Sequence, residues 1–357
     1  MRPIKCLVLR VCRLLGLFEV SAWLFRHRLQ ILCYHGFQLL DECAFRPLLF
    51  ISEATFERRL RRIAERGLRV MPLGDAVDQL QRGTLPHNAL VITIDDGFAS
   101  TSSVAAPLLQ RYGMPATVYV TTYYLEAELP IFRLAVHYVL WKAGTAARSG
   151  LNLEKLGFDM VASIDRRNLA SQIIQCGEAL GSERERQDLL ATLAAMLGVD
   201  LRQLYERRLL TLMSAEEVAE LAKRGVDIQL HTHRHRFSRD DKDAACAEIL
   251  ENQAKLRAVT GGEARHFCYP SGEFASTQWP WLEALGIESA TTCLSGSNAS
   301  ETPRYGLKRF LDSEAVDDIE FDAELSGFSE LTRALKGLVT LSMFSSVEFY
   351  QSRTSAR

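Results

Sequence analysis

Residues 90–97 read LVITIDDG. The five residues at the start are apolar or β-branched, which predicts a strand that is buried on both faces. Asp95 and Asp96 end this strand, and Gly97 allows the chain to bend so that both carboxylates reach one pocket. In an α/β barrel, catalytic groups gather at this end of a central strand. A solvated Asp-Asp-Gly turn would have the same letters, so the role of the pair depends on what else lies near it.

Short apolar runs alternate with helical periods on both sides of this strand, as is typical of β/α units around a largely parallel sheet. Further strands are expected at residues 31–34, 69–71, 116–121, 226–230, 265–269, 289–292 and 308–311. Ser214 and Glu217 have the Ser-x-x-Glu spacing of a capping box and predict the start of a helix. The sequence predicts an α/β barrel over residues 31–315, interrupted by a helical insertion at about residues 123–212 and followed by a C-terminal helical extension, residues 316–357.

The composition is that of a globular protein, with 47% hydrophobic and 24% charged residues in a chain of 357. The 42 Lys and Arg residues nearly balance the 44 Asp and Glu residues, for a formal net charge of −2. No nucleic-acid partner is therefore expected. The eight cysteines form no C-x-x-C pair and are interpreted as reduced, which favours a cytoplasmic location.

The first 30 residues predict an amphipathic helix. One face of its wheel is apolar and consists of Ile4, Leu7, Val11, Leu14, Phe18, Ala22 and Phe25. The uncharged runs between the arginines are too short for a secretory signal or a transmembrane helix, so neither is predicted. Two roles are open. The helix packs on the barrel, or it makes peripheral contact with the inner face of the membrane through residues 4–25.

A second group of chemically active residues follows the expected strand at 226–230. Residues 231–235 read HTHRH, and the spacing of His231 and His235 allows two imidazoles to meet at one ion if the segment turns helically. A His-rich surface loop is the alternative. Because both groups follow core strands, a barrel would bring them to the same mouth.

Two neutral imidazoles and one carboxylate form a facial triad for a divalent metal. Zinc fits this composition best, and iron, cobalt and manganese remain open. A metal-bound water becomes acidic enough to act as a nucleophile, and the remaining aspartate is free to act as the base. This chemistry suits the hydrolysis of an amide or an ester.

Three segments together resemble the polysaccharide deacetylases of carbohydrate esterase family four, which share the NodB homology domain. Residues 93–97 (TIDDG) are similar to the family's T-F-D-D-G motif, and residues 231–235 match its H-[S/T]-x-x-H motif. Residues 267–272 (FCYPSG) are similar to a third motif that forms one wall of the substrate groove. The resemblance implies a distorted (β/α)₇ TIM-like barrel that removes an acetyl group from an N-acetylated sugar.

The resemblance also implies a role for each matching residue. Asp95 would be the catalytic base, and Asp96, His231 and His235 would bind the metal. The groove segment would bind substrate through Tyr269, Pro270, Ser271 and Gly272, with its backbone helping to hold the oxyanion.

The chain departs from the family pattern at two places. Cys268 stands where the family commonly has an arginine that orients the base, and no histidine follows His266 to serve as the general acid. His35, at the end of the first strand, is a tentative replacement acid, with a core histidine as the alternative. Arg309, in the last strand, is too basic to donate a proton readily and is interpreted as a substrate-binding residue.

These observations lead to one main hypothesis and two alternatives. The main one is a metal-dependent N-deacetylase acting on an N-acetylated glycan or a lipid-linked sugar, with zinc as the expected cofactor. The second is a catalytically silent glycan-binding module of the same fold. The third is a deacylase of a non-sugar amide, because the metal chemistry does not identify the rest of the substrate.

Overall fold

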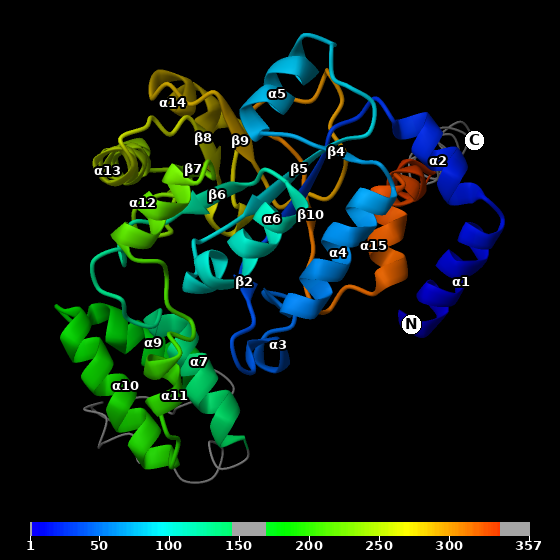
Figure 1. The fold of residues 1–357 in the computed structure, drawn as a ribbon. Helices are drawn as coiled ribbons and strands as arrows, with labels where there is room; N and C mark the ends of the chain where they lie inside the picture. Colours follow the sequence, from blue (N-terminus) through cyan, green and yellow to red (C-terminus); the bar gives the residue numbers. More distant parts are fainter. Residues whose placement is uncertain (1, 145–168, 336–357) are drawn as a thin grey trace, which may run out of the picture.

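A curled parallel sheet is the centre of the molecule. The structure is a computed structural model that describes residues 2–144 and 169–335 (Figure 1). The strands of this sheet are β1 (Gln30–Tyr34), β4 (Arg69–Val70), β5 (Ala89–Ile94), β6 (Thr117–Val120), β7 (Asp227–Leu230), β8 (His266–Cys268), β9 (Ser289–Thr291) and β10 (Phe310–Leu311). Their order is β10-β1-β5-β6-β7-β8-β9, with β4 pairing with the first residues of β5. Every pairing in this sheet is parallel.

The two ends of the sheet approach each other through the segment that leads into β10. Leu307 forms a parallel bridge with Thr291 of β9, and Phe310 pairs with Leu32 of β1. The sheet therefore curls into a distorted barrel, and the predicted α/β barrel class is confirmed. Strand β5 lies near its centre with all six residues buried, as its apolar sequence predicts.

Helices cover the outside of the sheet. They are α4 (Glu53–Glu65), α6 (Ala106–Tyr112), α12 (Ala215–Lys223), α13 (Lys242–Thr260) and α14 (Trp279–Ala284). The helix α5 (Leu73–Gln81) packs instead in a separate cluster with the inward-facing strand residues Val91, Tyr119 and Cys268. The predicted capping box is confirmed, because the Ser214 side chain accepts from the Glu217 amide and the Glu217 side chain accepts from the Ser214 amide. The segment before α6, Thr101–Ala105, is a π-helical turn that the sequence pattern did not reveal.

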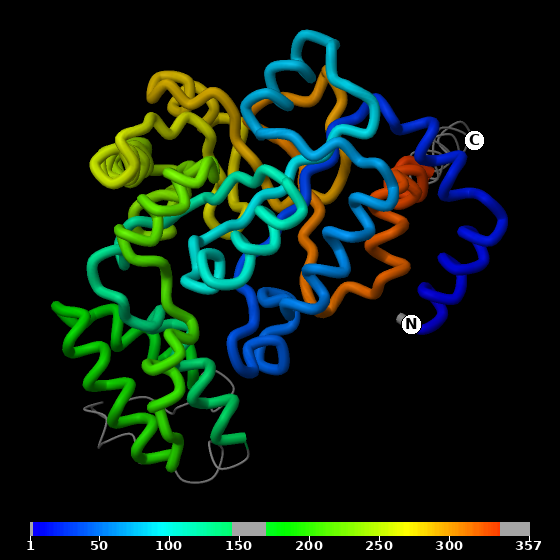
Figure 2. The backbone as a smooth tube through the Cα atoms, in the orientation of Figure 1, coloured from blue at the N-terminus to red at the C-terminus, as the bar shows by residue number. Residues whose placement is uncertain are grey.

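The chain between β6 and β7 contains a group of helices that lies apart from the sheet (Figures 1 and 2). They are α7 (Phe132–Ala143), α9 (Leu169–Ala179), α10 (Glu183–Leu197) and α11 (Arg202–Glu206), while residues 145–168 of the expected insertion lie outside the described residues. Their apolar cluster includes Phe50 of β3 (Phe50–Ile51) and Phe98, which follows directly after the Asp-Asp-Gly segment. These helices therefore pack beside the carboxyl end of β5.

The N-terminal segment forms two helices where the sequence pattern predicts one. α1 (Arg2–Leu14) and α2 (Leu17–Phe25) are separated at Gly16, whose φ of 73° is left-handed and ends the helical path. α1 contacts α15 (Asp318–Leu325), which lies at the start of the expected C-terminal extension. Residues 328–335 are also helical, and residues 336–357 lie outside the described part.

The face of α1 that packs is not the one that the helical wheel indicates. Cys6 and Leu9 are buried against α15, whereas Ile4, Leu7, Val11 and Leu14 are exposed. Within the described residues, no helix has the length and the apolar character needed to cross a bilayer.

Candidate metal and catalytic site

The two neighbouring acids occupy different surroundings at the end of β5. Asp96 and Gly97 have φ values of 69° and 83°, so the chain leaves the strand through two left-handed residues. This bend brings both carboxylates to the carboxyl end of the sheet. The Asp95 side chain is 2% exposed and that of Asp96 is 17% exposed, so only Asp96 retains appreciable contact with solvent.

Asp96 forms a compact group with two imidazoles. Its Oδ1 atom lies 3.2 Å from Nε2 of His231 and 3.4 Å from Nε2 of His235. The two histidines do converge, but not through a helical turn, because Thr232 and His235 both have positive φ. The chain after β7 instead doubles back through left-handed residues to bring His235 over the end of the strand.

The ring of His231 is oriented by a carbonyl group. Its Nδ1 lies 2.9 Å from the carbonyl oxygen of Cys268, and a carbonyl can only accept, so Nδ1 carries the hydrogen. When the ring is neutral, this fixes the tautomer that leaves the Nε2 lone pair available to a cation beside Asp96. Such an outer hydrogen bond is typical of histidines that bind metals.

The spacing of these ligand atoms fits a small divalent cation. Two ligands that are each about 2.0–2.1 Å from a tetrahedral zinc ion lie about 3.3–3.4 Å apart. The distances of 3.2 and 3.4 Å from Asp96 agree with this value. A carboxylate with two imidazoles is also a donor set that zinc and its neighbours prefer.

Two other groups of described residues also bring three ligand atoms within 4.8 Å of one another, and both contain Asp95. One adds Cys33 and His35, and the other adds His231 and Cys268. In either group a cation would face the guanidinium of Arg309, which already pairs with Asp95. The group of Asp96, His231 and His235 does not include Asp95, the partner of Arg309, and is therefore the better metal site.

Asp95 is paired with a fully buried arginine. The Arg309 Nη1 and Nη2 atoms each lie 2.7 Å from one carboxylate oxygen of Asp95. Burial by itself would raise the pKa of Asp95, but the charge and the hydrogen bonds of Arg309 outweigh it and hold that pKa well below its usual range. Asp95 is therefore an ionised carboxylate at neutral pH.

This pairing corrects the interpretation of Arg309 as a substrate-binding residue. Its side chain is 0% exposed, and its remaining Nε–H donates to the carbonyl of Thr292 at 2.9 Å. Arg309 holds the carboxylate as the family's arginine is expected to, but from the residue before β10 (Phe310–Leu311), which is separated from β5 by β1 alone. Sequence reasoning missed this partner, although its setting in a late strand of the core was a usable signal.

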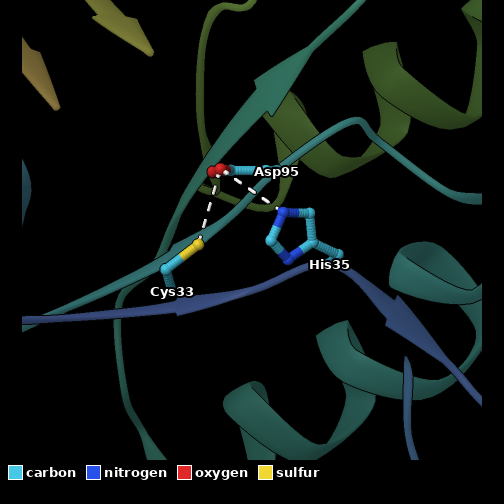
Figure 3. A group of neighbouring side chains, drawn as sticks. All are labelled: Cys33, His35 and Asp95. Atoms are coloured by element: carbon cyan, nitrogen blue, oxygen red, sulfur yellow. Dashed lines mark hydrogen bonds and ion pairs between the residues drawn. The ribbon is translucent and has the colours of Figure 1, made fainter. Parts of the chain in front are cut away.

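Two thiols and one imidazole complete the surroundings of Asp95. The Sγ atoms of Cys33 and Cys268 lie 3.4 and 3.3 Å from its Oδ2, and Nε2 of His35 lies 3.8 Å from the same oxygen. Figure 3 shows Cys33 and His35 from the first strand and its end, both pointing toward the Asp95 carboxylate. Burial raises the pKa of the Cys33 thiol, so it is a neutral donor here. The His35 side chain is 18% exposed and so has contact with solvent.

Asp96 and His231 influence each other's protonation. Burial would raise the pKa of Asp96, yet the hydrogen bond with His231 and the nearby His235 lower it to about 2. Burial would lower the pKa of His231, but Cys268 and the hydrogen bond to Asp96 raise it well above its ordinary value. A cation bound here would take the place of that proton, so metal binding would release it.

Tyr269, the aromatic residue of the third motif, does not line the substrate groove as expected. The Tyr269 side chain is buried, and its hydroxyl donates to the Tyr305 carbonyl at 3.0 Å, so it packs in the core instead of lining the groove. The amides of Tyr269 and Gly272 donate to the carbonyls of Thr291 and Tyr269. Pro270 is buried and has no N–H, and Ser271 is exposed with a φ of 58°.

An open cleft of about 590 Å³ lies between the second and third motifs. It is lined by His235, Arg236, Phe237 and Ser238 on one side and by Pro270, Ser271 and Glu273 on the other. A ligand in this cleft would contact the metal group through His235 and the third motif through Ser271.

Comparisons with known proteins agree with this geometry. Residues 82–290 match the family model described as polysaccharide deacetylase. No curated protein matches the sequence. Among solved structures, the deacetylase PplD from Streptococcus pyogenes in complex with acetate is similar with a TM-score of 0.55 at 15% identity, over 84% of this chain and 98% of that one. IcaB from Ammonifex degensii is similar with a TM-score of 0.52 at 17% identity, over 84% and 97%. A de-N-acetylase from Aggregatibacter actinomycetemcomitans has a TM-score of 0.52 at 14% identity, over 83% and 99%.

Proposed function

Because the chain belongs to the polysaccharide deacetylase family, whose members hydrolyse carbon–nitrogen amide bonds, we propose that it removes an N-acetyl group from an N-acetylated glycan. One observation carries the proposal. Asp95 is ionised and paired with Arg309, while the adjacent Asp96 faces two imidazoles. Two carboxylates in such different surroundings suit two different roles.

Asp96, His231 and His235 would hold a divalent cation, with zinc as the proposed ion. When bound, such an ion supplies a Lewis acid that lowers the pKa of water and polarises a carbonyl group. The residues themselves set the geometry. His231 is held by the Cys268 carbonyl, so the ligand group is organised before an ion arrives.

Asp95 is proposed as the general base that takes a proton from the attacking water. Its carboxylate stays ionised because Arg309 holds both oxygens, and the thiols of Cys33 and Cys268 contact Oδ2. Three of these four hydrogen bonds go to Oδ2 and only that from Arg309 Nη1 goes to Oδ1, so Oδ1 keeps a lone pair for the proton of a water.

His35 is proposed as the general acid. It lies at the end of the first strand with Nε2 3.8 Å from Asp95, and it is the partly exposed member of that group. Attack of water on the acetyl carbonyl forms one carbon–oxygen bond, and cleavage then breaks the carbon–nitrogen bond. The proton from His35 goes to the leaving nitrogen, so that acetate and a free amine are released.

The substrate is proposed to enter along the cleft beside His235. Ser271 is exposed there, and its amide is the candidate donor to the oxyanion because those of Tyr269 and Gly272 donate elsewhere in the fold. An open cleft of this kind favours an extended glycan. A lipid-linked sugar and a cytoplasmic location remain predictions from the sequence.

The test is acetate release from chitooligosaccharides by the purified, zinc-loaded chain. Asp95→Asn and His35→Gln are each expected to reduce kcat by about 10²–10⁴-fold, the range for loss of a general base or acid. Asp78→Asn, which changes an exposed acid of α5, is the matched control and should retain full activity. Zinc content measured for each variant should stay unchanged, because none of these residues is a proposed ligand.

Three results would contradict the proposal in different ways. Wild-type rates in Asp95→Asn would exclude this residue as the base. Binding of acetylated sugars without acetate release would favour the silent glycan-binding module. Cleavage of simple acyl amides, with no acetate released from any sugar, would favour a non-sugar deacylase.

A further inference from the structure

The two N-terminal helices expose a continuous set of large apolar side chains. On α1 these are Ile4, Leu7, Val8, Val11 and Leu14, and on the connection and α2 they are Leu15, Val20, Trp23 and Leu24. Leu14 is 87% exposed, Ile4 is 69% exposed and Trp23 is 63% exposed. We call this surface the α1–α2 apolar face. Single exposed apolar residues are ordinary, but a set of this size on adjacent turns marks an interaction surface.

The orientation of α1 is set by specific contacts with α15. Cys6 and Leu9 are buried in the cluster that contains Ile319 and Ala323. On either side of them, Lys5 pairs with Glu320 at 2.7 Å and Arg13 pairs with Asp322 at 2.9 Å. Two basic residues of α1 thus pair with acids of α15 beside the buried Cys6 and Leu9, and this leaves the apolar face directed away from the barrel.

The helix α2 supports the same orientation. Phe18 is buried, with its ring centroid 5.1 Å from that of Phe328, while Trp23 on the same helix is exposed. Figures 1 and 2 show α1 and α2 at the outer edge of the molecule, beside α15. The helical insertion lies at a different part of the molecule, so these helices are separate from the cleft that contains His235.

The N-terminal segment that carries the apolar face is rich in basic residues, and Arg10 and Arg26 are not among those that pair with acids of α15. Residues 1–30 contain six Lys and Arg residues and one acid, Glu19, in a chain whose net charge is −2. Arg10 is exposed on α1, and Arg26 places its guanidinium 4.7 Å from the ring centroid of Trp23. An exposed tryptophan with an arginine beside it, next to aliphatic side chains, is the combination that suits a membrane–water interface.

We propose that the α1–α2 apolar face docks on an anionic lipid bilayer. The aliphatic side chains would enter the boundary between the headgroups and the acyl chains, with Trp23 at the interface and the arginines among the lipid phosphates. The helices lie on the surface and do not cross it. This inference does not depend on the proposed deacetylase activity.

A second copy of the chain is a less suitable occupant. A two-fold contact through the same face would bring the cationic N-terminal segments of both copies together. Like charges placed across an interface oppose association, whereas an anionic bilayer attracts them.

The test is flotation of the full chain with vesicles of phosphatidylcholine alone, or with added phosphatidylglycerol. We expect binding to the anionic vesicles, weaker binding to pure phosphatidylcholine, and a decrease with rising salt. The double variant Leu7→Glu/Val11→Glu should lower the partition coefficient at least about tenfold, because two apolar anchors are lost and two negative charges are added.

Leu250→Glu is the matched control, since Leu250 is 52% exposed on α13 at a different part of the surface. It should bind like the wild type, and circular dichroism and acetate release should be unchanged in both variants. Equal binding by the double variant, or no binding by the wild type, would overturn the proposal. A dimer in light scattering that the double variant converts to a monomer would also overturn it and assign the face to a second copy.

Discussion

Asp95 and Asp96 are adjacent in the chain, yet opposite kinds of partner surround them. Asp95 is enclosed by a guanidinium and two thiols, and Asp96 faces two imidazoles that are free to bind a cation. Because Asp96 has a left-handed φ, the chain leaves the strand at this residue, and the two side chains point in different directions. A single bend therefore divides two chemically identical side chains between two different surroundings.

Arg309 should control the pH at which Asp95 can act. In the wild type the pKa of Asp95 is well below its usual range, so its carboxylate remains ionised and does not limit activity in mildly acid solution. In Arg309→Met, the main opposition to burial is lost and only the weaker effects of His35 and His231 remain, so that pKa rises. Activity should then be lost at low pH and recovered as the pH rises through the new pKa. The measurement is the pH profile of kcat/KM for acetate release.

Arg309→Lys serves as the control for this experiment. It keeps a positive charge beside Asp95, so its acid limb should lie between those of the wild type and Arg309→Met. Unfolding by urea should show a loss of about 3–5 kcal/mol for Arg309→Met, since a buried carboxylate is left without its partner. An unchanged pH profile in a folded Arg309→Met would show that Arg309 does not set the pKa of Asp95.

The elements that present the site are short and end abruptly. Strand β10 has two residues and β8 has three, but both lie within a sheet whose neighbours hold them in register. The segment after β8 turns through Ser271 and Gly272, both with positive φ. This tight turn places the third motif against the segment after β9, where Cys293 lies.

Gly272→Ala should destabilise the protein more than an ordinary glycine substitution. Gly272 has a φ of 69°, and a Cβ atom there would lie 2.5 Å from Cβ of Cys293. We expect a loss of about 1–3 kcal/mol in the free energy of unfolding by urea, from backbone strain and overpacking together. Gly83→Ala is the matched control, with the same φ of 69° and no atom within 4 Å of the added Cβ.

The control isolates the contribution of the backbone, since Gly83 has the same conformation in open space. If both variants lose the same free energy of unfolding, the contact with Cys293 contributes nothing to the loss. If Gly272→Ala also raises KM for the glycan, the turn positions the wall of the cleft as well as the fold.

Metal binding should stabilise the whole molecule, because its three proposed ligands come from segments that the sequence separates widely. Asp96 follows β5, while His231 and His235 follow β7, so an ion would join two parts of the barrel. Removal of zinc by a chelator should lower Tm, and added zinc should restore it. Free zinc at 100 times the Kd of the site should raise the free energy of unfolding by about 2.7 kcal/mol. For a chain of this size, that corresponds to an increase of a few degrees in Tm.

Asp96→Asn should remove this dependence on zinc, and Asp78→Asn should preserve it. The measurement is calorimetry with and without chelator at fixed protein concentration. A zinc-dependent Tm in Asp96→Asn equal to that of the wild type would place the ion elsewhere in the chain.

Much of the fold was predictable because strands and helices depend on local patterns. The buried strand at residues 89–94 and the helix that begins after Ser214 both follow from their own residues. The convergence of the acids with the two histidines also follows, since parallel strands bring their carboxyl ends to one mouth. The single helix expected at the N-terminus was wrong because Gly16 adopts a left-handed conformation and interrupts it.

Local periodicity and residue chemistry were sufficient to identify the barrel and the acids and histidines that meet at its mouth, because hydrophobic spacing and side-chain type are properties of short segments. The partners that act over long separations came only from the tertiary structure. Arg309 reaches Asp95, 214 residues away, because β10 pairs with β1 beside β5, and the strand's own sequence indicates that Arg309 lies in the core but not which side chain it meets. The apolar side of α1 faces outward because Cys6 and Leu9 pack against α15 while Lys5 and Arg13 pair with its acids, and these contacts exist only once the helices are packed.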